Sequence, residues 1–189
     1  MKKIHYIIAF IAFGTLLSFQ EATKTSEKEI NWLTIEEAIE LQKKDPRKII
    51  MDVYTNWCGP CKMLDKNTFH NEDVVDYINE NYYAVKFNAE GNDSVTYKEK
   101  NFSNPNYDPA KANRRNSAHE FTRFLKVRAY PTMVFFDEEA NFIAPISGYL
   151  KPQQLELYLK LFQSDKYKEM DTQEKFNKYY KTFKPTFKE

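Results

Sequence analysis

Short apolar runs separated by turns predict the strands of a sheet. Residues 49–54, 82–87 and 132–136 are short, mostly apolar and rich in β-branched or aromatic side chains, which is typical of buried strands. A turn over 137–141 leads into a fourth run, 142–146, so the last two strands are expected to form an antiparallel hairpin.

Apolar positions at helical spacing predict helices between these strands. Thr34 and Glu37 form a capping-box pattern, which predicts a helix from there to about Lys44. Asn71 is followed by two acidic residues, and it predicts the start of a second helix that ends at 79–81.

Two more helices are predicted later in the chain. Residues 118–127 resume an amphipathic pattern, in which His119 is expected to lie on the exposed side. Three apolar side chains of this helix are expected to face inward: Phe121, Phe124 and Leu125. Pro152 opens the last helix of the domain, because proline is tolerated in a first helical turn.

Residues 89–117 interrupt the alternation of strands and helices. This stretch contains two prolines and several asparagines, so a long irregular connection is expected, which in a compact domain is usually disordered or functional. Arg114 and Arg115, with Lys111, are candidates for an anion or substrate contact. A solvated loop is the favoured interpretation of these three residues.

The two ends of the chain have their own patterns. Residues 1–20 combine a basic start, a short apolar core and a polar exit, which predicts a signal peptide or an uncleaved membrane anchor, and hence a periplasmic or otherwise exported protein. Residues 21–29 are polar and predict a linker. The aromatic-rich extension at 164–189 predicts one or two short helices on the domain, or a partner-binding tail.

The charge balance excludes one class of partner. The formal net charge is +1, and without Lys2 and Lys3 the basic residues number 26 against 27 acidic residues. A nucleic-acid-binding protein would need a clear excess of positive charge, so no nucleic-acid partner is expected.

The strongest chemical signal comes from the only two cysteines, Cys58 and Cys61. They follow a predicted strand, and Pro60 suits the first turn of a helix, so Cys58 is expected at a helix N-terminus, where a thiolate is stabilised. This spacing predicts one reactive and one resolving sulfur. A purely structural disulfide is the alternative; the three scattered histidines do not complete a zinc site, so no metal is expected.

The segment from Trp57 to Lys62, with Asp52 six positions before the first cysteine, resembles the active-site segment of the thioredoxin family. Residues 85–88 resemble the family's third strand with its buried lysine, and 129–136 resemble its cis-proline segment. The resemblance covers roughly 30–162. It implies an α/β thioredoxin fold, with a central mixed sheet flanked by helices.

In this fold the domain is expected to span 30–163. An insert at about 89–117 would precede the helix before the cis-proline, and residues 164–189 would form a C-terminal helical extension.

The resemblance also implies roles for individual residues. Cys58 would attack a substrate disulfide and Cys61 would resolve the mixed disulfide, so the redox-active pair itself is the only cofactor expected. Asp52 is expected to be buried behind the pair and to exchange a proton with the resolving thiol, with Lys86 moderating its pKa if the two meet. A buried Asp52–Lys86 ion pair without a catalytic role is the alternative.

Substrate contacts are expected around the motif and the proline. If Pro131 is cis, the backbone of Tyr130 would offer N–H and C=O groups to an extended substrate. Trp57, Gly59 and Pro60 complete the predicted substrate-binding set.

The predicted function is therefore thiol-disulfide exchange on protein or peptide substrates. Gly59-Pro60 between the cysteines resembles reducing thioredoxins, whereas export suggests an oxidising compartment. We expect a reductase or isomerase outside the cytoplasm, supplied with electrons by a membrane protein. The alternatives are a disulfide-donating oxidase, or a non-enzymatic binding module that also uses the C-terminal extension.

Overall fold

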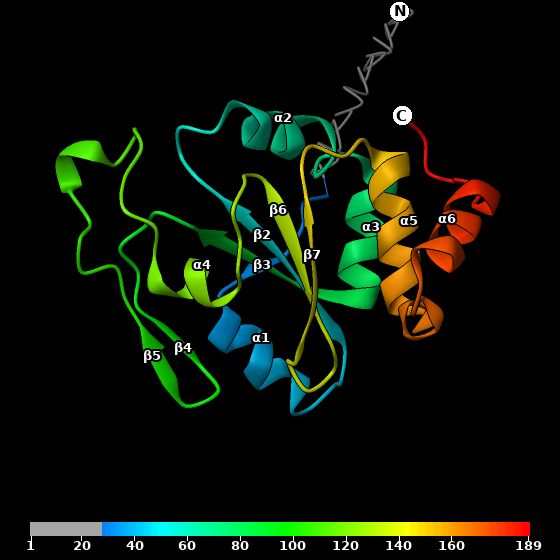
Figure 1. Cartoon of the computed structure of the whole chain (residues 1–189), viewed down its shortest axis with the longest axis horizontal. Helices are drawn as coiled ribbons and strands as arrows, with labels where there is room; N and C mark the ends of the chain where they lie inside the picture. Colours follow the sequence, from blue (N-terminus) through cyan, green and yellow to red (C-terminus); the bar gives the residue numbers. More distant parts are fainter. Residues whose placement is uncertain (1–27) are drawn as a thin grey trace, which may run out of the picture.

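A five-stranded mixed sheet forms the centre of the molecule, in the order β1-β3-β2-β6-β7 (Figure 1). The computed structural model describes residues 28–189. The strands of this sheet are β1 (Trp32–Leu33), β2 (Lys48–Tyr54), β3 (Tyr82–Asn88), β6 (Thr132–Phe136) and β7 (Phe142–Ser147). Strand β3 is parallel to β1 and β2, whereas β6 is antiparallel to β2 and β7. The predicted strands, the final hairpin and the α/β fold class are confirmed.

Helices cover both faces of the sheet (Figure 1). One face packs against α1 (Ile35–Gln42) and α4 (Glu120–Phe124), and the other against α3 (Glu72–Asn81) and α5 (Pro152–Gln163). Helix α2 (Gly59–Asn67) lies across one end of the sheet. The capping box of Thr34 and Glu37 at α1 is confirmed, as is the Asn71 cap of α3.

The insert differs from the irregular connection expected for 89–117. It contains a hairpin, β4 (Val95–Tyr97) and β5 (Lys100–Phe102), and a 3₁₀ turn, η1 (Pro109–Lys111). Val95 and Tyr97 are buried in the same core as Phe121, because alternate residues of a strand face the same side. The insert is therefore an ordered part of the domain, and a solvated loop describes only its exposed positions.

Two details of the helix predicted over 118–127 are corrected. Helix α4 is only five residues long, because Lys126 adopts the left-handed conformation just beyond its end. Phe124 is consequently 44% exposed rather than inward, although Phe121 and Leu125 are buried. His119 is fully buried rather than exposed: it caps α4, accepting from the Phe121 N–H, and its Nε2 lies 2.8 Å from the Asp93 carbonyl.

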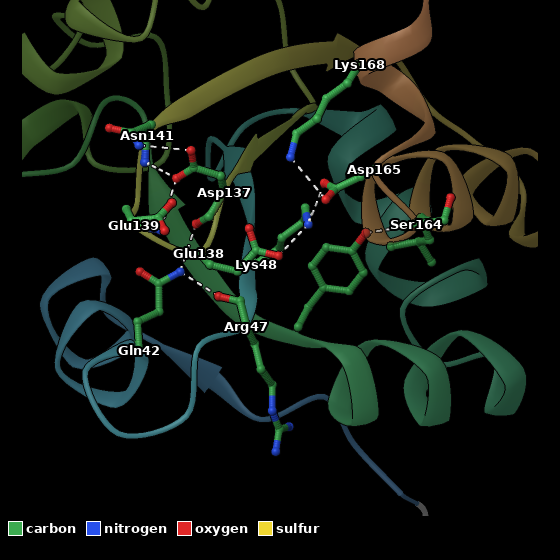
Figure 2. A network of polar contacts seen from close by, with 12 residues as sticks. Gln42, Arg47, Lys48, Asp137, Glu138, Glu139, Asn141, Ser164, Asp165 and Lys168 are labelled. Carbon is green, nitrogen blue, oxygen red and sulfur yellow. Dashed lines mark hydrogen bonds and ion pairs between the residues drawn. The ribbon is translucent and has the colours of Figure 1, made fainter.

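The C-terminal extension folds back onto the domain. It forms η2 (Lys166–Glu169) and α6 (Gln173–Thr182), which confirms the predicted helical extension. Figure 2 shows the start of the extension joined to the sheet by Lys48 of β2, whose buried ammonium lies 2.9 Å from Asp165 and also contacts Glu138.

The final residues are held by a buried carboxylate. Glu156 of α5 accepts hydrogen bonds from the backbone N–H groups of Thr186 and Phe187, at 2.8–2.9 Å. The Phe187 ring is buried against Tyr77 of α3, so part of the aromatic content of the extension is used within the domain.

The predicted signal or anchor segment, 1–20, and most of the predicted linker, 21–29, lie outside the described residues. Within 28–189, none of the helices combines the length and the apolar composition that crossing a membrane requires.

Candidate active site

Helix α2 begins at the first cysteine of the motif. Cys58 is the N-cap residue, and its sulfur accepts a hydrogen bond from the Cys61 N–H at 3.1 Å. The two cysteines form a disulfide and are both buried, whereas Gly59 and Pro60 between them are exposed. When the disulfide is reduced, the unpaired N–H groups of this first turn will stabilise a thiolate at Cys58.

Asp52 lies on β2, behind the cysteine pair. Its side chain is buried, and Oδ1 has no hydrogen-bond partner among the described residues. Burial raises the pKa of Asp52 to about 7, because a carboxylate loses its hydration there; the charge of Lys86 lowers this pKa and that of Asp65 raises it. The burial predicted for Asp52 is therefore observed.

Lys86 lies on β3 beside Asp52, but its ion pair is with another residue. Its ammonium bonds to Asp65 on α2 and sits over the rings of Trp32 and Tyr54, with the nitrogen 5.0 and 5.5 Å from their centroids. The Lys86 side chain is 29% exposed, so it is less buried than the resemblance implied. The alternative of a buried Asp52–Lys86 ion pair is wrong, and the two residues interact only through their charges.

These groups surround a pocket on the Cys61 side of the disulfide. The pocket has a volume of about 410 Å³. Its chemically relevant lining consists of Asp52, Cys61, Asp65 and Lys86. The buried Asp52 carboxyl, with a pKa of about 7, and the Cys61 sulfur therefore face the same cavity, which is the arrangement that proton transfer between them would require.

Trp57 lies in the turn before α2 and is held there by the insert. Its indole Nε1–H donates to Glu90 Oε2 at 2.7 Å, and the same oxygen accepts from the Asn116 N–H at 2.8 Å. The Arg115 guanidinium lies over the indole ring, 4.9 Å from the ring centroid, and Tyr130 meets the ring edge-on. The insert thus fixes the residue that precedes Cys58.

The proline loop forms the other wall of the site. The Tyr130–Pro131 peptide bond is cis, as predicted. The Pro131 carbonyl accepts from the Gly148 N–H, whereas neither backbone group of Tyr130 has a partner within the described part of the chain. Burial, with the Glu90 charge adding to it, raises the pKa of the Tyr130 phenol to about 12, so this hydroxyl stays neutral.

A second pocket, of about 560 Å³, lies on the Cys58 side of the disulfide. Its walls are the motif, the proline loop and the insert: Trp57, Cys58, Gly59, Pro60, Glu90, Arg115, Asn116, Arg128, Ala129 and Tyr130. The predicted substrate-binding residues except Pro131 therefore line one cavity together, and Pro131 follows directly in the chain.

Sequence reasoning missed several residues of the two pockets, among them Asp65, Glu90, Asn116 and Arg128. Asp65 lies four positions after Cys61 on a predicted helix, a spacing that places both on one face, and Arg128 lies three positions before the expected cis-proline. The local sequence therefore indicated that Asp65 and Arg128 lie near the site, whereas Glu90 and Asn116 are brought to it only by the fold of the insert.

Comparison with known proteins agrees with this geometry. Residues 35–163, more than half of the chain, match the model of the thioredoxin-like domain. The chain belongs to the thioredoxin-like family. A thioredoxin-fold protein from Helicobacter pylori has a similar structure, with a TM-score of 0.54 and 18% sequence identity over 83% of this chain and 89% of that one.

Two curated relatives of this thioredoxin-like chain carry the name thiol:disulfide interchange protein DsbD. The one from Pectobacterium atrosepticum is 24% identical over 121 residues, which is 63% of this chain and 17% of that protein. The one from Haemophilus ducreyi is 25% identical over 174 residues, covering 84% of this chain and 26% of that protein. The chain thus spans about a quarter or less of the length of these relatives.

The family fold and the closed Cys58–Cys61 pair together fit thiol-disulfide exchange as the chemistry of this thioredoxin-like domain.

Proposed function

We propose that this protein reduces or isomerises disulfides of proteins outside the cytoplasm. The observation that carries the proposal is the Cys58–Cys61 disulfide at the start of α2, with an open pocket on its Cys58 side and the buried Asp52 carboxyl on its Cys61 side. Each sulfur therefore has the surroundings that its step in disulfide exchange requires.

The reaction starts from the reduced protein. The Cys58 thiolate attacks one sulfur of a substrate disulfide; the substrate S–S bond breaks, a mixed disulfide forms, and the departing substrate thiolate takes up a proton. Cys61 then loses its proton and attacks the Cys58 sulfur; the mixed S–S bond breaks, and the second substrate thiolate leaves and takes up a proton. The products are a substrate dithiol and the protein disulfide, so two electrons pass from the protein to the substrate. The two protons that the substrate takes up balance those released when Cys58 and Cys61 ionised.

Asp52 accepts the Cys61 proton in the second step. With a pKa of about 7 its carboxyl is partly ionised at neutral pH, so it can take up and return a proton without a large energetic penalty. Lys86 and Asp65 act as positioning charges, because their opposite effects hold the pKa of Asp52 in this range.

The substrate lies along the proline loop. The free N–H and C=O groups of Tyr130 would pair with an extended substrate segment, as a strand edge does. Trp57, held by Glu90 and Arg115, forms the apolar wall beside the reacting sulfurs, and Gly59 and Pro60 leave the approach to Cys58 open.

Turnover needs a dithiol donor that reduces the Cys58–Cys61 disulfide. In an oxidising compartment we propose that this donor is a membrane protein carrying a thiol pair. The similarity to proteins named thiol:disulfide interchange protein supports exchange with another thiol-disulfide protein. Residues 1–20 would direct or anchor the chain. Any additional partner contact of the extension would fall on α6, where Tyr180 is 55% exposed.

The reduction potential of the Cys58–Cys61 couple tests the direction. Equilibration with glutathione should give a value near that of reducing thioredoxins, about −270 mV, and a value well above about −180 mV would make the protein an oxidase. Reduction of insulin disulfides by dithiothreitol should be accelerated by the wild type and not by Cys58→Ser. Equal acceleration by the variant would exclude catalysis at Cys58. Fractionation of cells expressing the full chain tests the compartment.

A further inference from the structure

The pocket beside Cys58 has a positively charged lining, because two of its three charged residues are arginines and the third is Glu90. The full sequence has a formal net charge of only +1, yet two guanidinium groups, Arg115 and Arg128, line this one cavity. Neither forms an ion pair or donates a hydrogen bond within residues 28–189. Two other basic residues of the insert do have partners: Lys111 forms an ion pair with Asp108, and Arg114 donates a hydrogen bond to the Ala110 carbonyl.

The two guanidinium groups reach the pocket from different segments. Arg115 belongs to the insert and is positioned by stacking over Trp57, next to the nucleophile in the sequence. Arg128 comes from the loop that leads into Tyr130, whose backbone is free to pair with a substrate. A substrate segment lying along Tyr130, with its sulfur at Cys58, would therefore lie among both groups.

The one carboxylate of this pocket is already engaged. Glu90 Oε2 accepts hydrogen bonds from the Trp57 indole and from the Asn116 N–H, so its charge is partly neutralised by these donors. Two guanidinium groups without ion-pair or hydrogen-bond partners among residues 28–189 line the same cavity as this one bound carboxylate. The net field of the cavity is positive and favours a negative substrate group, to which guanidinium groups bind in a bidentate manner.

We propose that Arg115 and Arg128 select polypeptide substrates that carry aspartate or glutamate next to the reacting cysteine. This inference rests on the proposed disulfide exchange at Cys58 and names the substrate class that the same site prefers. The insert thereby has a function: its residues 112–116 run along the active-site motif, with the Ala112 carbonyl bound to Asn56 and Asn116 bound to Glu90, and they deliver Arg115 to the substrate face.

The test uses single-turnover reduction of peptides by the pre-reduced protein, so no electron donor is needed. Three peptides share one disulfide and differ only in the two residues beside each cysteine, which are Asp-Asp, Ser-Ser or Lys-Lys. The second-order rate constant for release of peptide thiols is measured at low and at high salt. We expect the Asp peptide to react about tenfold faster than the Ser peptide at low salt, and this ratio to fall at high salt.

Substitutions then assign the preference to the two residues. Arg115→Ala and Arg128→Ala should each lower the Asp/Ser ratio about threefold, which is typical of one exposed charge pair, and the double variant should bring it to about one. Replacing both by glutamate should make the Lys peptide the fastest. Arg114→Ala is the matched control, because it removes the same charge one position away and should leave the ratio unchanged.

Each other result contradicts the inference in a recognisable way. If the wild type reduces the Ser peptide but shows no preference for the Asp peptide, selection by charge is wrong while the proposed function stands. If the wild type reduces none of the peptides, the proposed function itself fails. If Arg115→Ala slows all peptides equally, Arg115 acts only by holding Trp57. If Arg114→Ala lowers the Asp/Ser ratio as much as Arg115→Ala does, the preference comes from the overall charge of the protein and not from the two arginines of the pocket.

Discussion

The two sides of the Cys58–Cys61 disulfide are built by different kinds of structure. On the Cys61 side, Asp52, Asp65 and Lys86 come from β2, α2 and β3, so regular elements fix their positions. Asp52 is buried there and its pKa is about 7. Proton transfer depends on a fixed environment of low polarity, and the centre of a sheet supplies one.

On the Cys58 side, the polar groups come from connecting segments. Glu90 and Arg115 belong to the insert, and Arg128 and Tyr130 to the loop before β6. Loops can change without disturbing the core, which makes them the usual carriers of recognition. Under the proposed function, proton transfer therefore belongs to the Cys61 side of the disulfide and substrate choice to the Cys58 side.

The largest expected effect separates the two sulfurs. Cys58→Ala and Cys61→Ala should both abolish turnover, but only Cys61→Ala should accumulate a mixed disulfide, because it retains the attacking sulfur and lacks the resolving one. Non-reducing electrophoresis and mass spectrometry after mixing with a disulfide peptide detect the adduct. An adduct on the Cys58→Ala protein, formed through Cys61, would reverse the assignment of the two sides.

The second-largest expected effect is on stability. In the oxidised protein, Asp52 makes the free energy of unfolding depend on pH. The pKa of Asp52 is about 7 in the folded state, against 3.8 for a free aspartate, which stands for the unfolded state. Between these two pH values the folded state therefore binds more protons than the unfolded state. The contribution of Asp52 to the free energy of unfolding is therefore fully present below about pH 4 and is lost as the pH rises to about 7 and above. The loss should be at most about 4 kcal/mol.

Asp52→Asn removes this titration. Urea unfolding of the oxidised wild type and the variant at several pH values gives the difference in their free energies of unfolding, and that difference should shift in favour of the variant as the pH rises from about 4 to 8. His119 and the other titrating groups are common to both proteins, so the comparison isolates Asp52. If the free energies of unfolding of the two proteins changed in parallel with pH, the pKa of Asp52 would be the same in the folded and unfolded states. The carboxyl would then be ionised in the folded protein at neutral pH, as on an exposed surface.

The same substitution should slow resolution of the mixed disulfide by about a hundredfold at pH 7, at the lower end of the range for general acid–base catalysis. Attack by Cys58 should be much less affected, because Asp52 lies on the Cys61 side. Stopped-flow measurement of both phases separates the two steps. Glu72→Gln, an exposed carboxyl on α3, is the control, and an equal slowing of both phases would show that Asp52 does not act on Cys61 in particular.

The contrast between the two sides also explains which features the sequence could reveal. The strands, the Thr34 cap and the burial of Asp52 follow from local periodicity, since Asp52 stands in a continuous apolar run. The start of α2 follows from Pro60, which lies between the two cysteines and suits the first turn of a helix. The roles of the residues in catalysis and binding stay predictions for the experiments above.

The structure of the insert, which completes the Cys58 side, could not be predicted because it depends on long-range contacts. The β4–β5 hairpin turns at Lys98 and Glu99, both left-handed, where a recognisable turn would carry asparagine or glycine. The buried His119 ring donates its Nε2–H to the backbone carbonyl of Asp93, which lies 26 positions earlier in the sequence. Glu90 reaches Trp57 by the same folding of the insert, and no local pattern marks it.

The smallest expected effect concerns the charges around Asp52 and sharpens the account of the Cys61 side. Lys86→Gln should raise the pKa of Asp52, because the Lys86 charge lowers it, and Asp65→Asn should lower this pKa, because the Asp65 charge raises it. Carbon-13 NMR of the Asp52 carboxyl in the oxidised protein measures both shifts. Lys66→Gln removes an exposed charge from the same helix and should leave the titration unchanged. If Lys86→Gln shifted the pKa no more than Lys66→Gln does, burial alone would set the titration of Asp52, and the Lys86–Asp65 pair would only hold α2 against β3.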